Sequence, residues 1–275
     1  MHYDTVKVEI KNKIAKVILN RPEKKNAMSP QLHRDMTRAL EDLRYNEEAA
    51  VLVFTGAGGA FCAGMDLKEF FHATKLHDPA EYDRVLRLST EWRGRTLRYY
   101  PKPTISMING YCFGGAFSIV EGTDLAIAAK EAVFGLSEIN FRMFPGGSVS
   151  KSLANIMHSR DALLYAMTGR TFDGEEAARI RLVNYAVPLA DLEAETMRLA
   201  AEIAAKDPLA LQGCKDGYRF GLEMSWDASI SYTSAKENEI LLKQKGSWVE
   251  GAIGDFVKKK FKPGLEGHEA VEETP

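Results

Sequence analysis

The sequence predicts an α/β fold whose sheet is at least partly parallel. Short apolar runs at residues 50–54 and 104–108 alternate with segments of helical periodicity, and each run ends at a glycine turn. Runs of this length are typical of buried strands. Strands that alternate with helices are joined by crossovers, which make neighbouring strands parallel. The 275 residues, of which 45% are hydrophobic, suffice for one large core.

The elements before Gly147 can be justified in order. Alternation of polar and apolar residues predicts the opening hairpin. Ser29 and Pro30 are typical of a helix start, because serine caps the first amides and proline suits the first turn. The predicted series is a hairpin (6–19), a helix from Ser29-Pro30, a strand (50–54), a helix (79–99), a strand (104–108), a short helix (115–122) and a strand (124–128).

The pattern changes after Gly147. Helical periodicity dominates to Lys260 and is broken by one short strand-like run at residues 183–187. We therefore expect a core domain over residues 1–200 and a helical region over residues 201–262. The acidic remainder, residues 263–275, is expected to be a flexible tail.

Composition excludes several classes of protein. A net charge of −2 gives no electrostatic reason for general nucleic-acid binding. The three cysteines (Cys62, Cys112 and Cys214) and the six histidines show none of the spacings of metal sites, so we expect no metal. We find no signal-type segment and no apolar run long enough to span a membrane. We therefore expect a cytoplasmic protein without membrane or nucleic-acid partners.

One carboxylate stands among apolar residues. Glu138 lies in the otherwise apolar, strand-like run 133–139, ahead of a turn that contains Pro145 and two glycines. Removal from water disfavours the charged form of a carboxyl group, so such a residue is paired, protonated or functional. Glu138 is the candidate acid/base.

Two glycine-centred segments precede it, at residues 61–67 and 109–116. Each could be no more than a tight turn, with Asp66 capping the helix that follows. Each could also present bare backbone N–H groups, from Met65 and Gly115, to a developing oxyanion. Ser118 lies in the first turn after Gly115, and no Gly-x-Ser-x-Gly elbow or histidine partner marks it as a nucleophile.

The loop at residues 20–27 contains Asn20-Arg21-Pro22 and Asn26-Ala27. It follows a strand and precedes a helix. It could be a solvated polar loop, or it could contact the phosphates of a nucleotide-bearing carrier.

Taken together and in this order, these motifs resemble the crotonase (enoyl-CoA hydratase/isomerase) superfamily over nearly the whole chain. The resemblance implies a ββα spiral with a helical C-terminal extension that serves as a trimerisation or lid region, assembled as a homotrimer or a dimer of trimers. It implies an acyl-CoA substrate whose thioester carbonyl is polarised by the Met65 and Gly115 amides, with no cofactor beyond the CoA of the substrate itself. The residues implied to lie beside CoA are Lys24, Ala27, Ala63, Met65, Leu67 and Gly115.

Two positions that carry acidic residues in that superfamily indicate which of its subfamilies this chain resembles. Enoyl-CoA hydratases pair two glutamates, whereas here the first position is Ser118 and only the second is a carboxylate, Glu138. The resemblance therefore implies that the catalytic positions are Glu138, Met65, Gly115 and Ser118. Glu121, one helical turn further on, is expected to be structural. This combination resembles the hydroxycinnamoyl-CoA (feruloyl-CoA) hydratase/lyases, which hydrate an aromatic enoyl-CoA and then cleave it by a retro-aldol step to an aromatic aldehyde and acetyl-CoA.

The chain also departs from the lyase pattern. Two tyrosines that bind the phenol of the substrate are replaced by Phe70 and, on the late helix, by Ser234, although Tyr232 is close by. The residues implied to contact the ring are Phe70, Ser137, Phe141 and Tyr232. Arg142 is either in a surface ion pair or a cation that faces the ligand.

Two alternatives stay open. One is simple hydration or isomerisation of another bulky enoyl-CoA. The other is a non-enzymatic binding module, such as an RNA-associated crotonase relative, which the net charge and Glu138 disfavour.

Overall fold

The computed structural model describes residues 2–262 and 264. The chain forms two compact units, of which the first ends at Ile203 and the second begins at Ala204. Apart from Gly264, the predicted tail at residues 263–275 lies outside the described residues.

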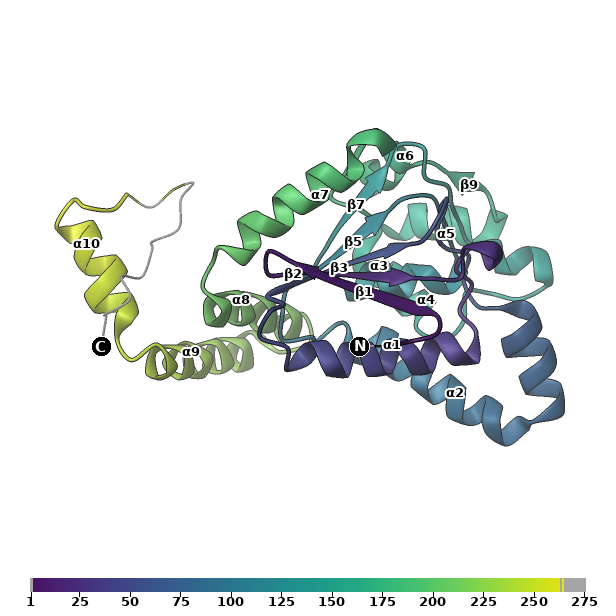
Figure 1. Ribbon diagram of the computed structural model, residues 1–275, viewed down its shortest axis with the longest axis horizontal. Coiled ribbons are helices and arrows are strands. Elements are labelled where there is room, and N and C mark those ends of the chain that lie inside the picture. Colours follow the sequence, from purple (N-terminus) through teal and green to yellow (C-terminus); the bar gives the residue numbers. More distant parts are fainter. Residues whose placement is uncertain (1, 263, 265–275) are drawn as a thin grey trace. The chain divides into compact units, whose positions relative to one another are not determined.

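The first unit contains a sheet of six strands in the spatial order β1-β2-β3-β5-β7-β10. β1 and β2 form the predicted antiparallel hairpin, and every other neighbouring pair is parallel. Figure 1 shows these strands side by side. All residues of β3 and β5 are buried, as expected of apolar runs at the centre of a parallel sheet. The strands are β1 (Val6–Lys11), β2 (Ile14–Leu19), β3 (Val51–Gly56), β5 (Thr104–Ile108), β7 (Leu125–Ala129) and β10 (Tyr185–Val187).

A second, smaller sheet was not predicted. Its order is β4-β6-β8-β9, with strands β4 (Ala60–Cys62), β6 (Tyr111–Phe113), β8 (Phe134–Gly135) and β9 (Thr171–Phe172). It corrects the sequence-based expectation of a strand over residues 133–139. β8 ends at Gly135, and Glu138 lies instead in the 3-10 helix η5 (Ser137–Phe141). The apolar run is buried from Phe134 to Leu136, and the helical turn that follows has no fully buried residue.

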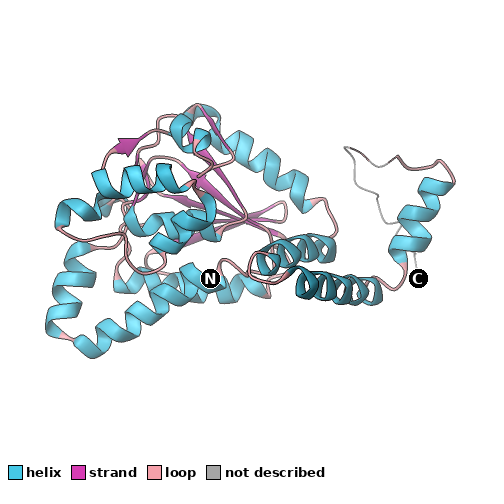
Figure 2. Cartoon of the chain, turned by 180° about the vertical axis from the view of Figure 1, so that it is seen from behind, coloured by secondary structure: helices cyan, strands magenta, loops and turns pink. Residues whose placement is uncertain are grey.

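Helices cover this core, as Figure 2 shows from behind. Local chemistry sets their starts: the Ser29 hydroxyl accepts from the Leu32 amide, 3.2 Å away, at the start of α1. The helices are α1 (Pro30–Arg44), α2 (Pro79–Glu91), α3 (Phe117–Gly122), α4 (Val149–Ile156), α5 (Ser159–Thr168), α6 (Gly174–Arg179) and α7 (Leu189–Ala204). Two 3-10 helices are η1 (Pro22–Lys24) and η4 (Gly114–Ala116), and two π-helices are η2 (Leu67–Lys75) and η3 (Trp92–Thr96).

The second unit is helical, as predicted. α8 (Pro208–Gly221) and α9 (Trp226–Lys243) pack against each other, with the rings of Phe220 and Tyr232 5.4 Å apart. The π-helical turn η6 (Trp248–Ile253) and α10 (Gly254–Val257) follow. Among the described residues, no helix combines the length and apolar character needed to cross a bilayer.

Candidate active site

Glu138 lies beside the turn that joins β6 to α3. A Cβ built on Gly114 would lie only 2.8 Å from the Oε1 atom of Glu138. The other carboxylate oxygen, Oε2, is buried and has no hydrogen-bond partner among the described residues. Burial raises the pKa of Glu138 above its ordinary value. An unpartnered carboxylate with a raised pKa is suited to exchange protons with a ligand.

Two glycines allow the neighbouring backbone to approach this carboxylate. Gly114 has φ +50° and Gly64 has φ +89°, values that favour glycine. A Cβ on Gly64 would lie 2.8 Å from the carbonyl oxygen of Phe113 and 3.5 Å from the amide nitrogen of Gly115. The two glycine-centred loops therefore meet directly next to Glu138.

This contact brings together the two amides predicted to be oxyanion donors. A Cβ on Gly115 would lie 3.4 Å from the Cγ atom of Met65. Gly115 lies in the first turn of the 3-10 helix η4, where amides lack partners within the helix. The amide of Met65 also donates no hydrogen bond within the described part of the chain. Both N–H groups are thus available to a ligand oxygen, at the positions that the sequence indicated.

Ser118 and Glu121 take structural positions on α3. Ser118 is fully buried, and its hydroxyl is 2.8 Å from that of Ser148. Glu121 is buried in an ion pair with Arg98 and accepts from Asn155, 3.2 Å away. The structural role that the sequence indicated for Glu121 is confirmed. Glu138 is left as the unpaired carboxylate beside the loops.

The loop at residues 20–27 is neither simply solvated nor simply a ligand contact. Arg21 is buried, and its guanidinium forms ion pairs with Asp66, at 3.0 Å, and with Glu69, at 2.7 Å. The side chain of Asn26 accepts from the Arg21 amide and donates to the carbonyls of Ala57 and Ala60. The expectation of a solvated loop is therefore wrong for Arg21 and Asn26, which are buried. Arg21 braces the loop that carries Met65.

Asp66 itself caps η2, as predicted. Its Oδ1 atom accepts from the amides of Lys68, at 3.1 Å, and Glu69, at 2.8 Å. The same carboxylate therefore fixes the helix start and, through Arg21, the neighbouring loop.

The residues predicted to lie beside CoA come from these two adjoining loops. The Ala63 amide donates to the Lys25 carbonyl at 2.9 Å, and Met28 forms a parallel bridge with Met65. Lys24 is exposed, Ala27 is half-buried, and Leu67, the first residue of η2, is 53% exposed. Lys25 lies over the ring of Tyr111, 4.0 Å from its centre. The two loops that carry these residues are thus joined backbone to backbone, and the side chain of Lys24 is accessible beside them.

Sequence reasoning missed Arg93, on the π-helical turn η3. Its guanidinium is buried and donates from Nη1 to the Gly115 carbonyl, at 2.9 Å, and from Nη2 to the Ser89 hydroxyl, at 2.7 Å. A signal was present, because Val85, Ser89, Trp92 and Arg93 share the helical spacing of one buried face.

The residues implied to contact the substrate ring belong to three elements: Phe70 to η2, Ser137 and Phe141 to η5, and Tyr232 to α9. Phe70 is fully buried, with edge contacts to the rings of His33 (5.7 Å) and Phe71 (5.1 Å). Phe141 is 61% exposed at the end of η5, which also carries the half-buried Ser137. Tyr232 belongs to the second unit and packs on Phe220.

Arg142 follows η5 with φ +58° and is exposed. Neither of the roles considered for it, a surface ion pair or a ligand contact, is visible in the described residues.

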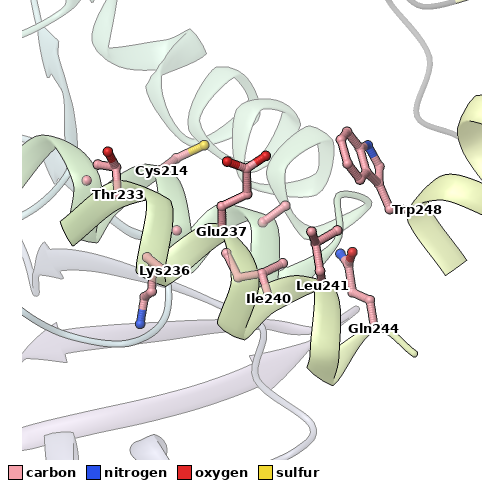
Figure 3. Close-up of a pocket in the computed structure, with 11 residues that line it drawn as sticks. Cys214, Thr233, Lys236, Glu237, Ile240, Leu241, Gln244 and Trp248 are labelled. Carbon is pink, nitrogen blue, oxygen red and sulfur yellow. The ribbon is translucent and has the colours of Figure 1, made fainter. Parts of the chain in front are cut away.

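The second unit contains a pocket of about 350 Å³ between α8 and α9. Figure 3 shows Cys214 and Glu237 extending into the space between the two helices. None of the residues that the sequence assigned to the candidate site lines this pocket.

Comparison with known proteins agrees with this geometry. The family model described as enoyl-CoA hydratase/isomerase matches residues 9–259. A hydroxycinnamoyl-CoA hydratase-lyase of Pseudomonas fluorescens is 46% identical over 267 residues, which cover 97% of this chain and 97% of that protein.

Solved structures agree on the fold. An enoyl-CoA hydratase from Bacillus anthracis superposes with a TM-score of 0.83 and 26% identity, covering 94% of this chain and 97% of that one. An enoyl-CoA hydratase subunit from Geobacillus kaustophilus HTA426 gives 0.83 and 28%, covering 96% and 99%. The predicted crotonase-like fold is confirmed.

Proposed function

This chain belongs to the enoyl-CoA hydratase/isomerase family, and we propose from that premise that it is a lyase that hydrates and then cleaves an aromatic enoyl-CoA. The substrate class is a hydroxycinnamoyl-CoA, such as feruloyl-CoA. The relative from Pseudomonas fluorescens supports this choice, because it matches almost the whole chain at 46% identity.

The thioester oxygen accepts hydrogen bonds from the Met65 and Gly115 amides. These donors stabilise the negative charge that develops on that oxygen, and one such donor typically contributes about 3–4 kcal/mol. Glu138, as the carboxylate, takes a proton from water while the oxygen adds to C3. It then returns that proton to C2 of the enolate.

The same carboxylate serves cleavage. It takes the proton of the C3 hydroxyl, C3 becomes the aldehyde carbonyl, and the electrons of the C2–C3 bond form the enolate of acetyl-CoA. The proton then passes from Glu138 to C2 of that enolate, which completes acetyl-CoA. All atoms are balanced without a redox step, so the reaction needs no cofactor beyond the CoA of the substrate.

One observation carries the proposal. Glu138 is an isolated, half-buried carboxylate whose Oε2 atom has no partner in the described residues, next to the loops of Met65 and Gly115. The other acid position holds Ser118, which is bonded to Ser148. One carboxylate therefore has to exchange every proton.

CoA binding is assigned to the edge formed by Lys24, Ala27, Ala63 and Leu67, where the exposed lysine can meet a phosphate. The acyl ring is assigned to Phe70, Ser137, Phe141 and Tyr232. These four residues come from three elements, of which α9 with Tyr232 belongs to the second unit.

Assembly and location belong to the same proposal. A homotrimer or a dimer of trimers is supported by α9, which has no buried residue within the single chain. A cytoplasmic location is supported by Cys62, Cys112 and Cys214, which are all free thiols and suit a reducing compartment.

Simple hydration or isomerisation of another bulky enoyl-CoA is the second candidate. It is favoured by Phe70, which has no hydroxyl to offer a phenol and is enclosed by other rings. A site that lacks a hydrogen-bond partner for a polar substituent gains nothing from that substituent.

Product analysis with feruloyl-CoA separates the two candidates. Incubation of the purified protein, followed by chromatography, should yield vanillin and acetyl-CoA in equal amounts. Accumulation of the 3-hydroxy thioester without vanillin would show that the chain is a hydratase and would overturn the lyase assignment.

A further inference from the structure

Arg93 is a buried charge without a counter-ion. Its guanidinium donates hydrogen bonds to the Gly115 carbonyl, the Ser89 carbonyl and the Ser89 hydroxyl, all of them neutral groups. No carboxylate pairs with it within the described residues. Burial lowers the pKa of Arg93 to about 10, so it keeps its charge at neutral pH. An uncompensated buried charge is costly, which calls for a reason to retain it.

The contrast with Arg98 makes this clear. Arg98 lies five residues later and is equally buried, but it is neutralised by Glu121. Arg93 is the one of the two that reaches a predicted oxyanion donor: its Nη1 atom lies 2.9 Å from the Gly115 carbonyl and 3.0 Å from where a Cβ of Gly115 would be. Met65 approaches the same point, with its Cγ atom 3.4 Å away.

We propose that Arg93 is a positioning residue that holds the Gly115 loop in place and supplies, from behind it, the positive charge that is neutralised when the thioester becomes an enolate. This deepens the proposed function and rests on it. A fixed charge in a region of low dielectric acts strongly on a charge that develops nearby, and it needs no reorganisation during the reaction. The negative charge that Arg93 meets is therefore the enolate, which exists only during the reaction. This explains why no carboxylate pairs with Arg93 in the described residues.

The surroundings of Arg93 fit this role. His33, which is fully buried nearby, accepts from the Trp92 indole at 3.0 Å. Burial and the charge of Arg93 keep the pKa of His33 well below its ordinary value, so it stays neutral. The other neighbours of Gly115 are the methyl carbon of Met28 and the side chain of Met65. Among these nearest neighbours of Gly115, Arg93 is the charged side chain.

The direct test measures the bound enolate. Acetoacetyl-CoA carries a 1,3-dicarbonyl that loses a C2 proton to solvent, and the resulting enolate absorbs in the near ultraviolet. Titration of the complex with wild-type protein gives the pKa of the bound ligand. Arg93→Met should raise this pKa by about one unit, the scale of one fixed charge acting across protein. Arg93→Lys, which keeps the charge, should retain most of the wild-type value.

Kinetics give a second readout. With feruloyl-CoA, Arg93→Met should lower kcat by about tenfold, the equivalent of one pKa unit, and should leave KM nearly unchanged, because the charge acts on the enolate rather than on the bound ground state. The matched control is the double variant Arg98→Met/Glu121→Leu, which removes an equally buried but neutralised guanidinium. It should leave the pKa of the bound enolate at the wild-type value.

The outcomes are distinct. If Arg93→Met and Arg93→Lys both keep the wild-type enolate pKa and change only thermal stability, Arg93 is merely structural and the inference is overturned. Should Arg93→Met fail to fold, Arg93→Gln provides the uncharged variant, and its bound-enolate pKa should rise in the same way, whereas an unchanged pKa would overturn the inference. The two proposals can fail separately. If the wild-type protein does not cleave feruloyl-CoA, the proposed substrate is refuted. If Arg93→Met nevertheless raises the pKa of the bound enolate, the role of Arg93 is supported.

Discussion

Glu138 links the chemistry to a property that can be measured. Because burial raises its pKa, the carboxylate is protonated at a higher pH than an ordinary glutamate, whose pKa is 4.5. The base form starts the reaction. Activity is therefore lost as the pH falls through this raised pKa.

The pH dependence of kcat/KM should accordingly show an acidic limb with its midpoint above pH 4.5. The N-acetylcysteamine thioester of ferulic acid, which has no phosphate, controls for titration of CoA. Stability should follow the opposite trend: a raised carboxyl pKa favours the folded state at low pH, and this contribution is lost as the pH rises through the folded-state pKa. An acidic limb at or below pH 4.5 would contradict the assignment.

Gly114 offers a second test at the scale of one residue. Gly114→Ala would place a methyl group 2.8 Å from Oε1 of Glu138 at a φ of +50°. We expect a loss of about 100-fold in kcat, as for a misplaced catalytic group. Gly147→Ala is the matched control, because Gly147 also has a positive φ (+59°) but open space around it. It should lose only about 1–2 kcal/mol of stability. Equal losses of activity in both variants would show that backbone strain, and not Glu138, is responsible.

At the scale of elements, two loops determine the site. The loop at residues 20–27 and the loop that carries Met65 are joined by the buried ion pair between Arg21 and Asp66, whose side chains are 9% and 8% exposed. Backbone contacts between the two loops are the bridge of Met28 with Met65 and the hydrogen bond from the Ala63 amide to the Lys25 carbonyl. The position of the Met65 amide therefore depends on this pair.

Arg21→Ala should lower the free energy of unfolding by about 3–5 kcal/mol, because it leaves the Asp66 carboxylate buried and unpaired. Arg87→Ala is the control: its pair with Asp83 is exposed, and such pairs contribute about 1 kcal/mol or less. Urea denaturation measures both. If Arg21→Ala were as mild as Arg87→Ala, the loops would be held by something other than this ion pair.

The sequence predicted elements whose signal is contained in their own residues. The central strands are mostly apolar, and α1 combines a serine cap, Pro30 and a stripe of apolar residues. The second sheet was missed because its strands are two or three residues long, too short for any periodicity. Met65, Gly115 and Glu138 stand in sequence motifs and their catalytic roles stay predictions, whereas no motif marks Arg93, because its partner is a backbone carbonyl at residue 115.

At the scale of the whole molecule, the second unit exposes apolar surface that a monomer has no reason to keep. Trp226 is 81% and Leu242 is 80% exposed within the single chain, and both lie on α9. Large apolar side chains that are exposed at both ends of one helix are typical of a surface that another chain covers. The proposed trimer would cover them.

Light scattering should therefore give a mass three or six times that of the 30.6 kDa chain. Leu242→Glu should shift the protein toward monomer, because burial of a charge in an apolar interface is unfavourable. Tyr45→Glu, at an equally prominent exposed residue of the first unit (75% exposed), should not. A monomeric wild-type protein would refute the assembly.

In the proposed mechanism one carboxylate, Glu138, serves both the addition of water and the cleavage of the carbon–carbon bond. The most direct measurement is the rate of acetyl-CoA release from feruloyl-CoA by Glu138→Gln, compared with wild type and with Glu121→Gln, which alters the structural glutamate. We predict that Glu138→Gln folds and binds acyl-CoA but loses about 10²–10⁴ in rate, the usual contribution of a general acid/base, while Glu121→Gln loses mainly stability. Turnover by Glu138→Gln within a few-fold of wild type would contradict the mechanism proposed for this enzyme.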